Sequence, residues 1–218
     1  MKQQNSQQNS QAGNGGYKQN IQSDSTGNSH RGMTRKLAES AVLIALGTIL
    51  SIFKIDMPMG GGLTICSMLP LVLLSFRYGW KWGTFSALAY SLLQLVLGLD
   101  NVQYATSFIM AAGVVFLDYV IAYTVIGLSG LAKEFIANKR TALTVGIAVT
   151  FALRFLCHFI TGIWIWNALW PNEYGMAGPV YSAVYNGWYM GAELVLTVLV
   201  ANLLYQPLGK YFRGDDLK

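Results

Sequence analysis

The stretch "TALTVGIAVTFALRFLCHFITGIWIWNALW", from Thr141 to Trp170, indicates the fold most directly. Up to Ile165 it is largely apolar, with Arg154 and His158 as exceptions, and it ends in closely spaced tryptophans. An apolar run of this length is typical of a helix that crosses a bilayer, and tryptophan is common where such helices meet the headgroups. Lipid offers no partner to free backbone amides and carbonyls, so the segment must be helical. The stretch therefore predicts an integral membrane protein, with tryptophans at the bilayer edge or in the wall of a pocket.

The composition of the whole chain supports this prediction. Of 218 residues, 53% are hydrophobic and 11% are charged, which is too few charges to cover a soluble protein of this size. A formal net charge of +5 is compatible with binding to nucleic acid. The charged residues lie between apolar runs, however, which indicates that they set the membrane topology. We therefore expect no nucleic-acid partner. Cys66 and Cys157 both fall inside apolar runs, so we expect buried packing residues without a disulfide.

Apolar segments bounded by turn-forming residues predict an all-α bundle of six transmembrane helices. The expected spans are residues 37–55, 63–76, 82–97, 107–128, 141–165 and 180–204. Before them, residues 1–32 are rich in Gln, Asn, Ser and Gly, a composition that we expect to be disordered. We therefore expect a polar tail at 1–32, a transmembrane substrate-binding domain at 33–210 and a short cytoplasmic tail at 211–218.

The basic residues predict how the bundle is oriented. All of the 15 lysines and arginines except Lys54 and Arg154 lie before the first expected span, after the last one, or in the connections that follow the second and fourth spans. Positively charged residues remain on the cytoplasmic side of membranes. We therefore expect a multi-pass protein of the plasma membrane with both termini in the cytoplasm.

Ionisable residues lie inside the expected spans, where each costs about 2.5 to 3.5 kcal/mol to insert. They are Asp118, Arg154, His158 and Glu193. One interpretation is an internal ion pair, of Arg154 with Asp118 or Glu193, that only fixes helix register. The other is a shared cavity in which the three full charges leave one net negative charge to balance an organic monocation.

The fifth expected span has a polar stripe. Arg154, His158, Gly162 and Trp166 recur at every fourth position and therefore share one helix face. Gly162 either lets a flat ligand approach the backbone or marks helix packing. Trp164 lies off the stripe and suits lipid or packing, whereas Trp166, and Trp170 above it, suit pocket walls.

The sixth expected span opens with aromatic residues in "PVYSAVYNGWYMG" (residues 179–191). Tyr181 and its neighbours are explained equally well by an interfacial aromatic belt. Asn186 is different, because a buried carboxamide needs partners for both its donor and its acceptor edge.

Motifs that the chain lacks narrow its function. It contains no GxxxxGK[ST], no HExxH and no metal-spaced Cys/His set. We therefore expect no enzyme activity, no cofactor or metal, and no ATPase within the chain. Near the start, Ala38, Ala41 and Ala45 form a small-residue face where another helix, of a partner or of the same bundle, can approach closely.

The chain resembles the thiamine-specific substrate-binding subunits of energy-coupling factor (ECF) transporters. The resemblance covers about residues 35–204 and rests on "HFITGIWIW" (158–166), "YSAVYNG" (181–187), "SMLPLVLLSFRYGWKWG" (67–83) and "FLDYVIAY" (116–123). It implies a six-helix bundle that captures thiamine from outside. It also implies docking, through Ala41 and Ala45, on a shared module of a transmembrane coupling protein and two ATPases.

The resemblance also implies site residues. Five residues match ligand-lining positions of the family: His158, Gly162, Trp166, Tyr181 and Asn186. Trp170 matches a further such position, in a loop of different length. At three other positions the family has Glu-Tyr where this chain has Asp118 and Tyr119, lysine where it has Arg154, and tryptophan where it has Tyr90. Glu193 is included from the charge argument alone. The loop at 57–62 lacks the tryptophan that closes the site in some relatives, so we expect Met57, Met59 or backbone to act as a lid.

These residues suggest a binding mode. The aminopyrimidine stacks on Trp166, with its polar edge held by Asn186 and Tyr181. Asp118, with Glu193, balances the thiazolium, and Arg154 and Tyr119 suit the hydroxyethyl end. The alternatives are a subunit for another vitamin, a scaffolding membrane protein, and a self-sufficient proton symporter that uses His158 with Asp118 or Glu193.

Overall fold

The computed structural model describes residues 14–57 and 61–217, with side chains from residue 31 onward. Contacts divide the chain into residues 1–39 and residues 40–218. In the first unit, the described backbone is the beginning of helix α1 (Asn14–Ile52), where Arg35 Nε lies 2.8 Å from Glu39 Oε1. Helix α1 therefore includes part of the 1–32 segment that we expect to be disordered, and the first thirteen residues of that segment lie outside the described residues.

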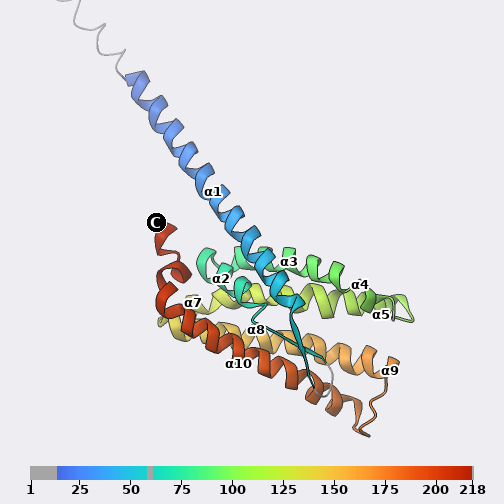
Figure 1. Cartoon of the computed structure of the whole chain (residues 1–218). Coiled ribbons are helices and arrows are strands. Elements are labelled where there is room, and N and C mark those ends of the chain that lie inside the picture. The colour runs from blue at the N-terminus through green and yellow to red at the C-terminus, as the bar shows by residue number, and fades with distance from the viewer. Residues whose placement is uncertain (1–13, 58–60, 218) are drawn as a thin grey trace, which may run out of the picture. The chain divides into compact units, whose positions relative to one another are not determined.

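Residues 40–218 form a helix bundle (Figure 1). After α1 come a hairpin of strands β1 (Lys54–Asp56) and β2 (Gly62–Thr64), then helices α2 (Leu69–Tyr78), α3 (Trp80–Leu97) and α4 (Leu99–Val102). One long helical segment follows, made of α5 (Phe108–Gly113), the π-helix η1 (Val114–Ile121), α6 (Ala122–Thr124), the 3-10 helix η2 (Val125–Leu131) and α7 (Ala132–Phe135). The chain ends with α8 (Lys139–Thr161), the π-helix η3 (Gly162–Trp166), α9 (Asn167–Leu169), α10 (Gly178–Arg213) and the 3-10 turn η4 (Asp215–Leu217).

Three helical segments of the described chain are long and apolar enough to cross a membrane. They are Phe108–Phe135, Lys139–Leu169 and Gly178–Leu217, and an 18-residue stretch within each has a mean hydropathy of 2.1, 1.9 and 1.5, respectively. These segments coincide with the last three spans expected from the sequence. The first of them extends beyond the C-terminal end of its expected span, and the other two extend beyond both ends of theirs. The prediction of a mainly helical membrane protein is confirmed.

The expected second span, residues 63–76, is wrong at its beginning. Its first residues belong to strand β2, which pairs antiparallel with β1 so that Lys54 faces Thr64. Cys66 then adopts a positive φ of 55°, and Pro70 lies in the first turn of α2. Because a left-handed residue and a proline both interrupt a preceding helix, α2 starts only at Leu69. Residues 54 and 55, which the sequence assigned to the first span, lie in strand β1, so a short hairpin is added to the mainly helical bundle.

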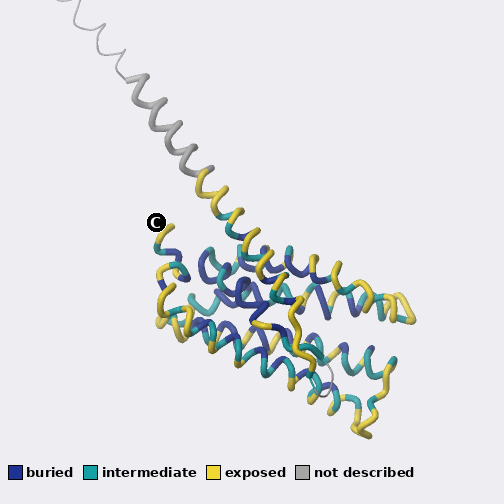
Figure 2. The backbone as a smooth tube through the Cα atoms, in the orientation of Figure 1, coloured by how far each residue is buried: buried dark blue, intermediate teal, exposed yellow. Residues whose placement is uncertain are grey.

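Helix α2 forms the centre of the apolar core. Leu71, Val72, Leu74 and Phe76 are completely or almost completely buried, and Figure 2 shows buried residues concentrated around this helix. A helix that is apolar on all sides belongs inside a protein, which explains why so short a helix is stable here. Both cysteines are free and buried, as the sequence predicts. The C-terminal turn also packs, because Arg77 binds both carboxylate oxygens of Asp216, at 2.6 and 2.8 Å.

Candidate ligand-binding site

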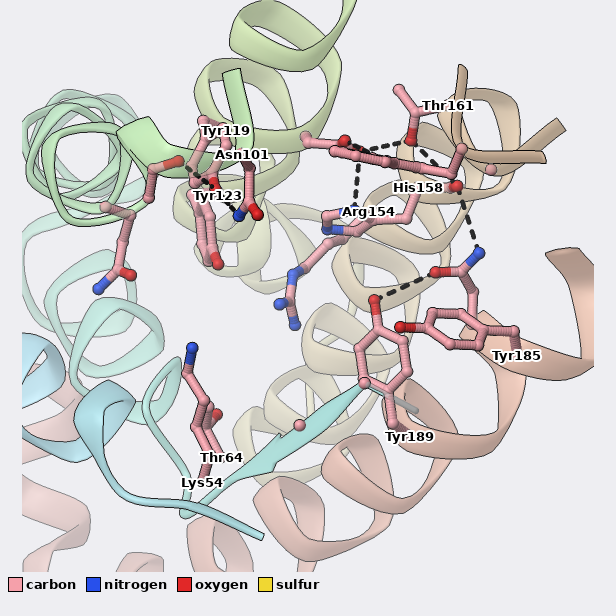
Figure 3. A pocket seen from close by; sticks show the side chains of 18 of the residues that line it. Lys54, Thr64, Asn101, Tyr119, Tyr123, Arg154, His158, Thr161, Tyr185 and Tyr189 are labelled. Carbon is pink, nitrogen blue, oxygen red and sulfur yellow. Dashed lines mark hydrogen bonds and ion pairs between the residues drawn. The ribbon is translucent and has the colours of Figure 1, made fainter. Parts of the chain in front are cut away.

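A cavity of about 870 Å³ opens between the β1–β2 hairpin, the end of α3, and the helices η1, α8, η3 and α10. This volume is within the range of small-molecule sites in proteins. Figure 3 shows Arg154 reaching into the cavity from α8 and Lys54 from β1, while Tyr185 and Tyr189 face it from α10. Nine residues that the sequence predicts as a binding site line this cavity, namely Asp118, Tyr119, Arg154, His158, Gly162, Trp166, Trp170, Tyr181 and Asn186.

Two π-helical segments place several of these side chains. Asp118 and Tyr119 lie in η1, and Gly162 and Trp166 lie in η3. A π-helical turn contains an extra residue, which shifts the side chains that follow it around the helix, and such turns are frequent at functional sites. Both walls of the cavity are therefore built where the helical register departs from the α-helix.

Asp118 is the acidic centre of the cavity. Its Oδ1 contacts His158 Nδ1 at 3.0 Å and accepts a hydrogen bond from the Thr161 hydroxyl, while its Oδ2 accepts one from Trp166 Nε1 at 2.8 Å. Only 7% of Asp118 is exposed. Donors on both oxygens stabilise a carboxylate that has lost most of its water. The Trp166 ring is in turn fixed beside the charge.

Arg154 and Glu193 form a separate buried ion pair. Arg154 Nη1 lies 2.7 Å from Glu193 Oε2, and the two side chains are 6% and 1% exposed. Glu193 Oε1 also accepts hydrogen bonds from the hydroxyls of Thr64 and Ser67. Glu193, a predicted ligand-contacting residue, therefore lies behind Arg154 and does not line the cavity. Since this pair is neutral as a whole, Asp118 provides the negative charge beside it.

Tyr90, another predicted site residue, also lies behind the cavity wall. It is completely buried and does not line the cavity. Its ring packs edge-on against Tyr123, with the centroids 5.6 Å apart. Tyr123, which does line the cavity, also lies 5.1 Å below the Arg154 guanidinium. Tyr90 therefore supports the wall from behind.

Two further predicted residues, Tyr119 and Asn186, are hydrogen-bonded to their neighbours. Tyr119 accepts a hydrogen bond from Asn101 Nδ2 at 2.7 Å and donates one to the Gly98 carbonyl at 3.1 Å. Asn186 donates to the Ser182 carbonyl at 2.9 Å and accepts from the Tyr189 hydroxyl at 3.1 Å. The carboxamide thus finds the partners that a buried position requires.

Gly162 has a packing role. A Cβ atom there would fall on the Ser182 hydroxyl and 3.2 Å from Asn186 Nδ2. The missing side chain lets η3 and α10 approach closely at the cavity, as small residues do in membrane helices. Trp164 lies outside the cavity and is 45% exposed, in agreement with the lipid or packing role expected for it.

Several lining residues are not among the predicted ones. They include Lys54, Gln94, Asn101, Tyr123, Thr161, Tyr185 and Tyr189. The fourfold spacing of Tyr181, Tyr185 and Tyr189 is a signal that indicates one helix face. For the lid, Met57 lines a groove on α10 and not the cavity, and Met59 lies outside the described residues.

Helices that cross a membrane around a cavity with a buried carboxylate and aromatic walls define a membrane protein that binds a small organic molecule. The described residues contain no cluster of three His, Cys, Asp or Glu side chains that suits a metal ion. The family can be stated as well: residues 37–213 match the model of the family described as "Thiamine transporter protein (Thia_YuaJ)", and the chain belongs to this family. It is therefore a transport protein and not an enzyme, and the resemblance found in the sequence is confirmed.

Individual relatives agree with this family. The chain is 29% identical to the thiamine transporter ThiT of Bacillus subtilis, over 83% of this chain and 95% of the relative. It is 28% identical to ThiT of Lacticaseibacillus paracasei, over 69% of this chain and 77% of the relative. The fold matches a solved structure of ThiT from Listeria monocytogenes with a TM-score of 0.65 at 21% identity, covering 83% of this chain and 98% of that one.

Proposed function

We propose that the chain captures thiamine outside the cell and acts as the substrate-binding subunit of an ATP-driven ECF transporter. The observation that carries this proposal is the position of Asp118 in a cavity walled by Trp166 and by tyrosines of α10. A carboxylate and aromatic faces together suit a flat organic cation, since both stabilise positive charge away from water. Thiamine combines such a cation with an aromatic pyrimidine, and the names of the relatives point to the same vitamin.

The proposed binding mode follows the fixed groups of the cavity. Trp170 stacks on Trp166 with the ring centroids 5.7 Å apart and the planes at 14°. The aminopyrimidine would therefore use the opposite face of Trp166, with its polar edge toward Asn186 and Tyr181. In this position the thiazolium approaches Asp118.

The other end of the ligand would meet different groups. The hydroxyethyl group would reach Arg154 and Tyr119, which are held by Glu193 and Asn101 respectively. Hydrogen bonds to groups that are already fixed cost little ordering entropy on binding.

The proposal extends to topology and partners. We infer six transmembrane segments in the plasma membrane with both termini in the cytoplasm, a membrane domain at 33–210, and tails at 1–32 and 211–218. The basic residues support this orientation. Ala41 and Ala45 are exposed on α1, as expected if they receive a helix of the transmembrane coupling protein, whose two ATPases supply the energy.

A proton-coupled transporter that works alone is the second candidate. The contact of His158 Nδ1 with Asp118 Oδ1, at 3.0 Å, favours it, because such a pair can exchange a proton. Uptake of radiolabelled thiamine into proteoliposomes that contain only this chain decides between the two. Uptake that follows an imposed proton gradient supports the symporter, and uptake that requires ATP and the coupling module supports the ECF subunit.

Ligand identity is tested with the purified chain. Thiamine, thiamine diphosphate, riboflavin and biotin are titrated separately while tryptophan fluorescence is followed, since Trp166 and Trp170 line the cavity. We expect strong quenching by thiamine at the lowest concentrations. Saturable quenching by another vitamin without a response to thiamine contradicts the proposed substrate, and a complete lack of ligand binding supports a scaffolding role.

A further inference from the structure

Two columns of aromatic rings run from surface loops into the cavity. The tyrosine column consists of Tyr174, Tyr181, Tyr185 and Tyr189, with successive centroids 6.0, 5.7 and 5.8 Å apart. The tryptophan column consists of Tyr104, Trp170 and Trp166, with centroid distances of 5.0 and 5.7 Å. In each column, therefore, successive ring centroids are at most 6.0 Å apart.

Both columns begin outside the cavity. Tyr174 belongs to the α9–α10 connection and Tyr104 to the α4–α5 connection, which lie at the same end of the bundle (Figure 1). Neither residue lines the cavity, whereas every other member of the two columns does. Their exposed fractions are 56% for Tyr174 and 51% for Tyr104. The columns thus connect the solvent-facing loops with the binding site.

The inner ends of the columns meet the polar groups of the site. Trp166 donates its indole N–H to Asp118, so the tryptophan column ends at the acidic centre. Tyr189 donates its hydroxyl to Asn186, so the tyrosine column ends at the carboxamide. An interfacial belt explains the outermost rings, but it does not require rings that follow one helix face down to a buried carboxylate.

We propose that these two columns form the access path along which the organic cation enters the cavity. The inference rests on the proposed function, because it needs a cationic aromatic ligand. A cation loses water as it moves inward, and a ring face within about 6 Å compensates for part of that loss. Rings spaced at this interval keep the cation in contact with at least one face at each step, which lowers the barrier to entering and to leaving.

The path makes a kinetic prediction that differs from that of a binding-site residue. Tyr174 and Tyr104 touch the ligand in transit and not in its final position. Their removal raises the barrier equally in both directions, so the association and dissociation rate constants fall together and Kd stays constant. An exposed cation–aromatic contact corresponds to about a two- to fivefold change in rate.

The experiment is stopped-flow tryptophan fluorescence with thiamine as the probe. The test variants are Tyr174→Leu and Tyr104→Leu, which leave all tryptophans in place. Phe108→Leu is the matched control, because Phe108 is 87% exposed at the beginning of α5 and lies outside both columns. Tyr174→Phe keeps the ring face and is expected to retain the native rates.

A second probe isolates the charge. An uncharged thiamine analogue, with carbon in place of the thiazolium nitrogen, should enter native protein and the Tyr174→Leu variant at equal rates. For thiamine, rates that fall in both directions at constant Kd support the path. Native rates in both test variants, or a weaker Kd at an unchanged association rate, overturn it.

The outcome is separable from failure of the proposed function. If native protein shows no response to thiamine, the proposed substrate is wrong. If native protein binds thiamine and the test variants behave like Phe108→Leu, only the access path is wrong.

Discussion

Replacing Asp118 with asparagine tests the electrostatic basis of the site. The side chain keeps its size, but the carboxylate charge disappears from a position that is only 7% exposed. With an effective dielectric constant of about 20, a unit positive charge about 5 Å from the carboxylate gains roughly 3 kcal/mol. Loss of this term corresponds to an affinity for thiamine about 100-fold weaker.

The assay is isothermal titration calorimetry of native protein and the Asp118→Asn variant with thiamine. The matched control is Asp100→Asn, which removes the same charge from the lining of the same cavity, but at an exposed residue. Because exposed charges are screened by water and salt, we expect less than about a threefold change in the control. Binding of the uncharged thiamine analogue should be nearly equal in native and Asp118→Asn protein.

Stability must be measured alongside affinity. The Asp118 carboxylate accepts from Thr161 and Trp166, and an amide nitrogen in place of one oxygen removes one of these two hydrogen bonds, although the Thr161 hydroxyl can still donate to the His158 carbonyl at 3.1 Å. Such a loss costs about 1 to 3 kcal/mol, which thermal unfolding without ligand detects. If a folded Asp118→Asn protein binds thiamine within about threefold of native affinity, the charge argument is refuted.

Three further changes test other parts of the structure. Glu193→Gln leaves the Arg154 charge uncompensated at a side chain that is 6% exposed, so thermal unfolding in detergent should show a loss of about 3 to 5 kcal/mol; an unchanged transition contradicts the ion-pair role. Gly162→Ala places a methyl group on the Ser182 hydroxyl and should destabilise the protein by about 1 to 3 kcal/mol. In the control Gly191→Ala nothing lies within 4 Å of the new Cβ, so this variant should be neutral or slightly stabilised. Equal unfolding transitions in the two variants contradict the packing role of Gly162. Lys54→Ala removes an exposed positive charge from the cavity lining and should tighten thiamine binding by no more than about threefold in a titration at low salt, with the difference shrinking as salt is added; weaker binding indicates instead that Lys54 contacts the ligand.

Many site residues were predictable because a helical period determines which side chains share a face. Arg154, His158, Gly162 and Trp166 follow this period on α8 and η3, and all four line the cavity. The cost of placing ionisable groups in lipid singles out Asp118 for the same purpose. These arguments use only local spacing and solvation, which a sequence contains.

Pairing between distant elements was not predictable in the same way. Arg154 had two acidic candidates, and the structure pairs it with Glu193 and assigns Asp118 to His158, Thr161 and Trp166. The choice depends on how α8, η1 and α10 are rotated against one another. The π-helical turns of η1 and η3 alter this rotation, and the residue pattern of the sequence does not predict these turns.

Composition, residue spacing and family resemblance were enough to identify the chain as a helical membrane protein of the thiamine transporter family and to predict nine of the residues that line the cavity. The packing of the helices was needed to show that Glu193 and Tyr90 lie behind the cavity wall, that a β-hairpin closes one side, and that two columns of rings lead inward. The physical reason is that solvation and helical period act within one segment. Whether a polar side chain meets a ligand or a neighbouring helix depends on packing between segments that are far apart in the chain.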